Sequence, residues 1–117
     1  MNTAKIFVTQ VPHRRDNGTG SYVPIFNLTP ATEFGDLITM MPPKAAYTAT
    51  GDLVRQLEEK LEDYRYEEGD AVLLLGDTSI IAATVAILAR KHLKFAVLRW
   101  DRVIGRYSRV VFNFGVV

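Results

Sequence analysis

The feature that most constrains the fold is a succession of three apolar segments between residues 71 and 100. Residues 71–75 (AVLLL) form an uninterrupted apolar run, which is typical of a strand buried on both faces of a sheet. Residues 79–91 have the length and composition of a helix, and residues 94–100 again contain the residue types of a strand. A strand, a helix and a strand in this order are expected to form a right-handed crossover between parallel strands. The sequence therefore predicts an α/β fold.

The predicted helix at residues 79–91 is apolar on every side. Only Ser79, Thr84 and Arg90 interrupt a series of alanine, isoleucine, leucine and valine side chains. A helix of this kind is expected to be buried on more than one side. In a small domain, that cover would come either from a loop or hairpin of the same chain or from a partner subunit.

A second strand and helix precede this unit. Residues 36–41 read as a short apolar strand that two prolines end, and Leu53, Leu57 and Leu61 then recur at helical spacing. The acidic residues of this region fall largely between the apolar positions, so we expect the acids from Glu58 to Asp70 to form a solvated face. The helix is expected to cover one face of the sheet.

Two hairpins complete the expected fold. Residues 94–100 and 107–114 form the C-terminal hairpin, which adds an antiparallel strand to the mainly parallel sheet. Residues 5–11 and 21–28 are expected to form an N-terminal hairpin, because the polar, glycine-containing segment 13–20 between them is typical of a mobile tip.

We therefore expect a single α/β domain over residues 1–117, with the N-terminal hairpin at 1–28 and the α/β core, including two main helices, at 29–117. The chain has no cysteine, which excludes disulfides, iron–sulfur clusters and thiol nucleophiles. The first residues lack the layout of a signal peptide, and the longest apolar stretch, residues 80–89, is shorter than the ~18–20 residues of a membrane span. These features predict a soluble, cytoplasmic protein.

Charge is distributed unevenly along a chain whose net charge is only +1. Residues 51–70 contain eight acidic and three basic side chains, a net charge of −5. Residues 90–109 contain seven basic side chains and one acidic side chain, a net charge of +6. The two segments predict separate acidic and basic surfaces, which would allow pairing between subunits.

A tight turn between the strand at 71–75 and the helix at 79–91 is the first candidate site. It is formed by Gly76, Asp77, Thr78 and Ser79. Ligands of open α/β sheets bind where strands end and helices begin, because helix N-terminal N–H groups attract anions. The turn has neither the three glycines of a dinucleotide fingerprint nor the lysine of a P-loop. A simple helix cap by Asp77 or Thr78 is the favoured interpretation, and a ligand site is the alternative.

The C-terminal hairpin is the second candidate site, because it interleaves arginines with aromatic residues. Such a pattern would suit phosphates and stacked bases, an acidic protein partner, or an edge strand that charges protect from aggregation. We favour the solvated edge, and the two binding interpretations stay open. The residues concerned are Arg99, Trp100, Arg102, Arg106, Tyr107 and Arg109.

The histidines predict no catalytic chemistry. His13, Arg14 and Arg15 would clamp an anion only if the loop that carries them were held in place, and a solvated tip is the favoured interpretation. The other histidine, His92, lies far away in the sequence and has no carboxylate cluster beside it. The chain therefore shows neither a metal site nor an acid–base pair, and we expect no cofactor.

Several short motifs resemble one group of known proteins. They are Glu33-Phe34-Gly35, Gly76-Asp77 after a buried strand, Ala89-Arg90 in the second helix, and Leu98-Arg99-Trp100-Asp101-Arg102 before Tyr107. Over residues 29–114 the chain resembles small hypothetical proteins of tailed bacteriophages. The resemblance implies a viral protein that works in the cytosol of a bacterial host, and it brings no catalytic residues with it.

From these patterns we expect a non-enzymatic phage accessory protein that acts through contacts with a host or phage protein. We also expect self-association, through the helix at 79–91 or through an exposed strand. The first alternative is a small nucleotide- or anion-binding domain that uses the turn from Gly76 to Ser79. The second is nucleic-acid binding through the C-terminal hairpin, which the modest net charge does not favour. We expect no membrane association.

Overall fold

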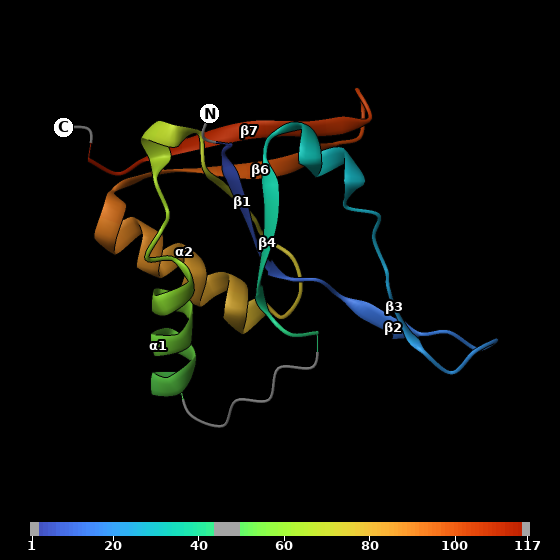
Figure 1. The fold of residues 1–117 in the computed structure, drawn as a ribbon. Helices are drawn as coiled ribbons and strands as arrows, with labels where there is room; N and C mark the ends of the chain where they lie inside the picture. The colour runs from blue at the N-terminus through green and yellow to red at the C-terminus, as the bar shows by residue number, and fades with distance from the viewer. Residues whose placement is uncertain (1–2, 44–49, 116–117) are drawn as a thin grey trace.

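The computed structural model describes residues 3–43 and 50–115 and shows a mixed α/β fold (Figure 1). A five-stranded sheet has the order β4-β1-β5-β6-β7, in which all neighbouring strands are parallel except β6 and β7. This architecture confirms the predicted fold class. The elements are β1 (Lys5–Gln10), β2 (His13–Arg15), β3 (Tyr22–Pro24), the 3-10 helix η1 (Thr29–Glu33), β4 (Asp36–Met41), α1 (Thr50–Lys60), the 3-10 helix η2 (Tyr66–Glu68), β5 (Ala71–Leu73), α2 (Thr78–His92), β6 (Lys94–Asp101) and β7 (Arg106–Asn113).

Strand β1 lies inside the sheet, so the predicted pairing of residues 5–11 with residues 21–28 is wrong. Its residue Ile6 is paired with Leu37 of β4 on one side and with Ala71 of β5 on the other. The hairpin is smaller than predicted: β2 and β3 form a separate two-stranded sheet that projects from the body (Figure 1). The physical reason is burial, because an apolar strand such as β1 is more stable between two neighbours than in a solvated hairpin.

The connections between parallel strands use both faces of the sheet. The chain passes from β1 to β4 through η1 on one face, and from β4 to β5 and β5 to β6 through α1 and α2 on the other. The first connection moves toward one edge of the sheet, and the two helical connections move toward the opposite edge. The η1 connection and the two helical connections thus differ both in the face they use and in the direction they move. They therefore have the same handedness, as expected for crossovers between parallel strands.

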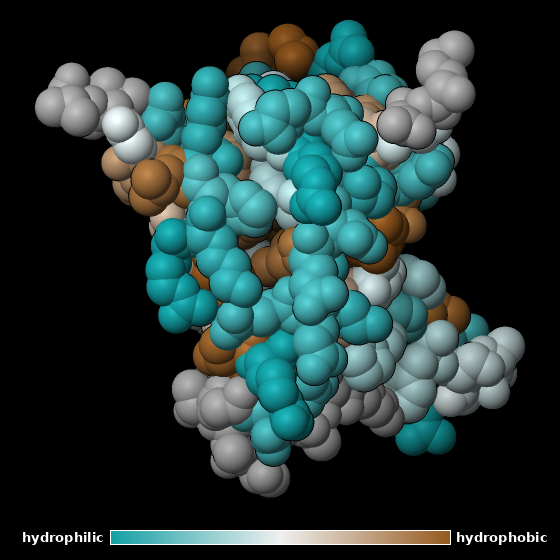
Figure 2. Space-filling model, turned by 60° about the vertical axis from the view of Figure 1, so that its left-hand side comes forward, coloured by the Kyte–Doolittle hydropathy of each residue, from teal (hydrophilic) through white to brown (hydrophobic). Residues whose placement is uncertain are grey.

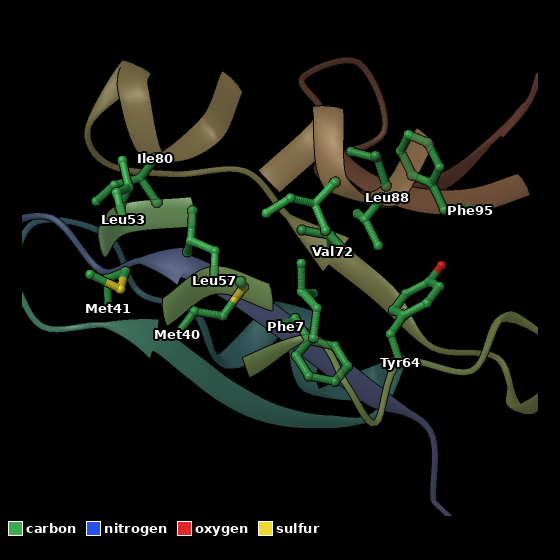
Figure 3. Close-up of a cluster of buried hydrophobic side chains, with 13 residues drawn as sticks. Phe7, Met40, Met41, Leu53, Leu57, Tyr64, Val72, Ile80, Leu88 and Phe95 are labelled. Atoms are coloured by element: carbon green, nitrogen blue, oxygen red, sulfur yellow. The ribbon is translucent and has the colours of Figure 1, made fainter. Parts of the chain in front are cut away.

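The main core lies between the sheet and the two helices (Figure 3). Leu57 of α1 and Leu88 of α2 are fully buried against Phe7 and Val72 of the central strands. A smaller core on the opposite face contains Ile6, Val8, Ala31, Leu73 and Leu98, and η1 covers part of it. Strands β1 and β5 are therefore apolar on both sides, which explains their near-continuous apolar sequences.

Within the single chain helix α2 is buried on one face only, so the predicted cover by a loop or hairpin of the same chain is wrong, and cover by a partner subunit stays a prediction. Ile80, Ile87 and Leu88 are buried, whereas Ala82 and Ala86 are exposed to solvent. An alanine presents a single methyl group, so an alanine face in water loses little hydrophobic free energy. The surface turned forward in Figure 2 is mostly hydrophilic, with apolar side chains showing in patches.

The prediction of a solvated acidic segment fails at Asp70, which is fully buried. Its Oδ1 accepts a hydrogen bond of 2.8 Å from the backbone N–H of Lys5, and its Oδ2 accepts one of 2.9 Å from the N–H of Arg65. The Lys5 Nζ lies 3.1 Å from the same carboxylate. Asp70 therefore ties the start of β1 to the segment that leads into β5. No described helix is long and apolar enough to cross a membrane.

Candidate functional site

The turn at Gly76–Ser79 folds as a helix cap. The Oδ1 of Asp77 accepts a hydrogen bond of 2.8 Å from the N–H of Ser79, in the first turn of α2. Gly76 has φ +92°, and a Cβ at this position would lie 2.5 Å from the Oε1 of Gln10. Glycine is therefore required both for the backbone conformation and for the close approach of Gln10.

Gln10 is the residue of this region that the sequence did not single out. It is buried at the end of β1, where its Nε2 donates a hydrogen bond of 2.9 Å to the carbonyl of Pro42. Its Oε1 accepts one of 2.8 Å from the N–H of Asp77. The only signal in the sequence was a polar residue at the end of an apolar strand.

The crevice between the carboxyl ends of β1 and β5 is consequently filled by the chain itself. After β1 the chain continues on one face of the sheet, and after β5 it continues on the opposite face. Ligands of α/β proteins commonly bind at such a point. Here the Gln10 carboxamide lies against the turn, and the Thr9 hydroxyl accepts a hydrogen bond of 2.7 Å from the Leu75 N–H. Two of the N–H groups at the start of α2, those of Asp77 and Ser79, already have acceptors within the chain. A ligand site at Gly76–Ser79 stays a prediction.

The basic and aromatic residues of the C-terminal hairpin do not form one continuous surface. Trp100 and Tyr107 are cross-strand neighbours, with ring centroids 5.0 Å apart, and Tyr107 is buried. Arg106 pairs with the carboxylate of Glu33 at 2.9 Å. The guanidinium of Arg109 lies over the ring of Tyr66, 5.0 Å from its centroid. Both arginines of β7 are thus engaged with residues of the same chain.

The remaining arginines of this region are more open. Arg99 is exposed, and its Nη2 lies 3.9 Å from the carboxylate of Asp101. Arg102 is exposed in the turn between β6 and β7. In this turn the Oδ1 of Asp101 accepts a hydrogen bond of 2.9 Å from the backbone N–H of Val103. Of the four arginines that the nucleic-acid interpretation requires, two are therefore engaged within the chain. Arg99 and Arg102 remain accessible.

His13, Arg14 and Arg15 form strand β2. The Nδ1 of His13 lies 2.7 Å from the carbonyl of Val11, and both arginines are exposed. The segment predicted to be a mobile tip is closed by hydrogen bonds, including one of 2.7 Å from the Asp16 N–H to the Ser21 carbonyl. The structure places these residues on a separate hairpin, apart from the turn at Gly76–Ser79.

Charge pairing within the chain also joins the predicted acidic and basic segments. Lys91 at the end of α2 places its Nζ 2.7 Å from the carboxylate of Glu58 on α1, and Arg90 lies 3.4 Å from it. The hydrogen bond from Lys91 lowers the pKa of Glu58. Part of the charge that was expected to pair between subunits is therefore neutralised inside one molecule.

The two histidines lie in different surroundings: His13 is on β2 and His92 is at the end of α2. Desolvation, together with the positive charge of Arg65, lowers the pKa of His92, whose ring lies edge-on to Tyr64. Tyr64 is buried, which raises its pKa, and its hydroxyl accepts a hydrogen bond of 3.0 Å from the Ala96 N–H. Within residues 3–43 and 50–115, no three metal-ligating side chains gather around one point.

An apolar groove with a volume of about 580 Å³ opens at the carboxyl edge of the sheet. Strand β5 ends at Leu73, whereas β6 continues to Asp101, so the β6–β7 hairpin extends beyond its neighbour. The groove begins at this step, where Leu74 and Leu75 line it, and continues along the hairpin to Val97, Val110 and Phe112. Its aromatic and polar lining residues are Phe26, Asn27, Arg99, Trp100, Tyr107 and Phe112. Of these, Arg99, Trp100 and Tyr107 belong to the basic and aromatic residues predicted as a candidate surface.

Strand β7 forms one edge of the sheet and presents apolar side chains to solvent. Val111 is 42% exposed, Phe112 is 41% exposed, and Phe114 just beyond the strand is 59% exposed. The rings of Phe112 and Phe114 stack with centroids 6.3 Å apart. An edge strand with such residues is a template for pairing with another chain.

The fold and these surfaces define a small α/β protein with a mainly parallel sheet, an open apolar groove and an apolar edge strand. The chain belongs to the family described as Phage Pam3 gp32-like protein, whose model it matches over residues 4–114. This membership confirms the resemblance to bacteriophage proteins. No curated protein and no solved structure is significantly similar to the chain.

Proposed function

We propose that this phage protein is a non-enzymatic accessory protein that works by binding proteins in the cytosol of the infected bacterium, and that a second copy of the chain is one of its partners. The contact is the free edge of β7. The observation that carries this proposal is the absence of an outward charge on the second half of β7, where Val110, Val111, Phe112 and Asn113 follow one another.

Edge strands are commonly protected from pairing by charged side chains. On β7 the two arginines lie in the first half of the strand, where Arg106 is held by Glu33 and Arg109 by Tyr66. Neither arginine is therefore placed to protect the second half. This distribution favours association through the edge over an edge that only faces solvent.

Two copies of β7 related by a two-fold axis at Val111 would pair antiparallel. Val110 of one copy would lie opposite Phe112 of the other, and Arg109 would lie opposite Asn113, so no like charges meet. Such an isologous contact is the commonest kind in homo-oligomers. It would join the two sheets into one and cover apolar side chains that are exposed in the single chain.

Sedimentation velocity at micromolar concentration tests this proposal with two matched variants. Val111→Lys places a charge on the edge, and Val103→Lys places the same charge in the turn between β6 and β7, where Val103 is 94% exposed. We expect a dimer for the parent chain and for V103K, and a monomer for V111K. A monomeric parent chain, or a V111K variant that dimerises as well as V103K, would refute the proposal.

A further inference from the structure

We propose that the groove at the carboxyl edge of the sheet binds an organic monoanion with an apolar body, the class that includes medium-chain carboxylates. The inference does not rest on self-association, although Val110 and Phe112 of β7 line the groove and also belong to the edge that is proposed to pair. Its volume of about 580 Å³ is in the range of small-molecule sites.

The apolar side chains that line the groove indicate that the main part of the ligand is apolar. Phe26 and Trp100 line it and are 50% and 44% exposed, and Leu75 and Leu98 contribute aliphatic surface. Exposed aromatic surface of this extent is unusual in a place without a partner, and covering it would contribute favourable free energy. An apolar chain or ring system therefore fits the walls, whereas a sugar or a nucleotide phosphate chain would leave its polar groups without partners.

The positive charge of Arg99 indicates that the ligand carries an anionic group. Among the described residues that line the groove, Arg99 is the charged one, and Asn27 supplies a polar side chain. The Arg99 guanidinium has one weak contact, 3.9 Å from the carboxylate of Asp101, so it keeps donors for an anion. Guanidinium groups bind carboxylates strongly because two parallel N–H groups match the two oxygens. One arginine among the described lining residues suits one anionic group rather than a polyphosphate.

The location supports the same conclusion. Ligands of open α/β sheets bind beyond the carboxyl ends of the strands, and this groove is at that edge. The neighbouring crevice between β1 and β5 is filled by Gln10. The groove begins one strand further along this edge, at the step where β6 extends beyond β5.

Trp100 is the only tryptophan of the chain, so its fluorescence reports directly on the groove. The test is a titration with decanoate below its micellar concentration, at fixed protein concentration, and a parallel titration with decanol. The two probes share the apolar chain and differ in charge. We expect a saturable blue shift of the Trp100 emission with decanoate, because the ring is transferred from water to an apolar contact, and an affinity for decanol that is lower by about tenfold.

Two variants locate the anion. Arg99→Gln removes the guanidinium at the groove, and Arg102→Gln removes an exposed guanidinium that does not line it. We expect R99Q to bind decanoate about tenfold more weakly and to bind decanol as the parent chain does, while R102Q behaves like the parent chain with both probes. Thermal unfolding of both variants shows whether they remain folded.

Several outcomes would overturn the proposal. They are no spectral shift with decanoate, equal affinity for the acid and the alcohol, and equal weakening in R99Q and R102Q. A blue shift that develops with protein concentration alone would also overturn it, because a second copy of the chain would then be the occupant of the groove.

Discussion

Two neighbouring places on one edge of the sheet differ in what fills them. Between the carboxyl ends of β1 and β5, the side chains of Thr9 and Gln10 bind the backbone of the segment that leads into α2. Between β5 and β6, the edge is left as a groove lined mainly by apolar side chains. The first place is closed by specific hydrogen bonds, and the second is open to solvent.

The comparison shows how a position typical of ligand binding can be converted into a structural one. A buried carboxamide supplies both donors and an acceptor, so Gln10 can satisfy backbone groups of two different loops. The carboxamide thereby engages backbone groups that a ligand at this crevice would otherwise contact. The groove has no such side chain, and its exposed aromatic residues contribute little to the folded state of the single chain. Substitutions in the two places should therefore have opposite consequences for stability and for binding.

The largest effect is expected for Gly76→Ala. The new Cβ would approach the side chain of Gln10 to 2.5 Å, and the residue would keep a φ of +92°. We expect a loss of about 3 kcal/mol in the free energy of unfolding, from overpacking added to backbone strain. Urea denaturation followed by circular dichroism measures it.

Gly105→Ala is the matched control for this substitution. Gly105 also has a positive φ, +67°, but nothing lies within 4 Å of the position of its Cβ. It should therefore show the backbone strain alone, about 1 kcal/mol. Equal losses of unfolding free energy in the two variants would mean that the Gln10 side chain can move away from the new Cβ at no cost. The crevice at Gln10 would then be no more tightly packed than the groove.

A smaller loss is expected for Gln10→Leu, which keeps the apolar volume and removes the carboxamide. The Pro42 carbonyl and the Asp77 N–H lose the partner that Gln10 supplies, which should destabilise the fold by about 2 kcal/mol. Gln56→Leu on α1, at a partly exposed position, is the control, and its change should stay within about 0.5 kcal/mol. If Q10L were as stable as Q56L, the hydrogen bonds of Gln10 would not be what closes the crevice.

The contrast between these two places also marks how far sequence patterns reach. The unit from β5 through α2 to β6 was predicted correctly because its signals are local: an apolar run, a capping residue at Asp77, and a second apolar run. Strand β1 was assigned to a hairpin because the turn signals after it are equally local. Its place inside the sheet depends on Ile6 and Val8 packing on one face and Phe7 packing on the other. The choice between the hairpin and the sheet is therefore decided by the whole core and not by a local signal.

The candidate surfaces were predicted less completely for the same reason. Trp100 and Arg99 were named from a pattern within one hairpin, but Phe26 joins them from a segment far away in the sequence. Arg106 and Arg109 were named as members of a candidate binding surface, and their contacts with Glu33 and Tyr66 could not be predicted because those residues are also distant in sequence. Exposure on α2 was misjudged since composition does not distinguish a buried helix from one whose outer face consists of alanine.

The smallest change in stability is expected for Phe26→Ala, which opens the wall of the groove. Half of this side chain is exposed, so the free energy of unfolding should change by less than about 1 kcal/mol. Decanoate, in contrast, would lose part of the apolar surface that covers its chain, and its affinity should fall about fivefold while that for decanol falls equally. Trp100 emission measures both affinities, and urea denaturation measures the stability. A large loss of stability with unchanged decanoate binding would reverse the comparison, because Phe26 would then support the fold in the way that Gln10 does.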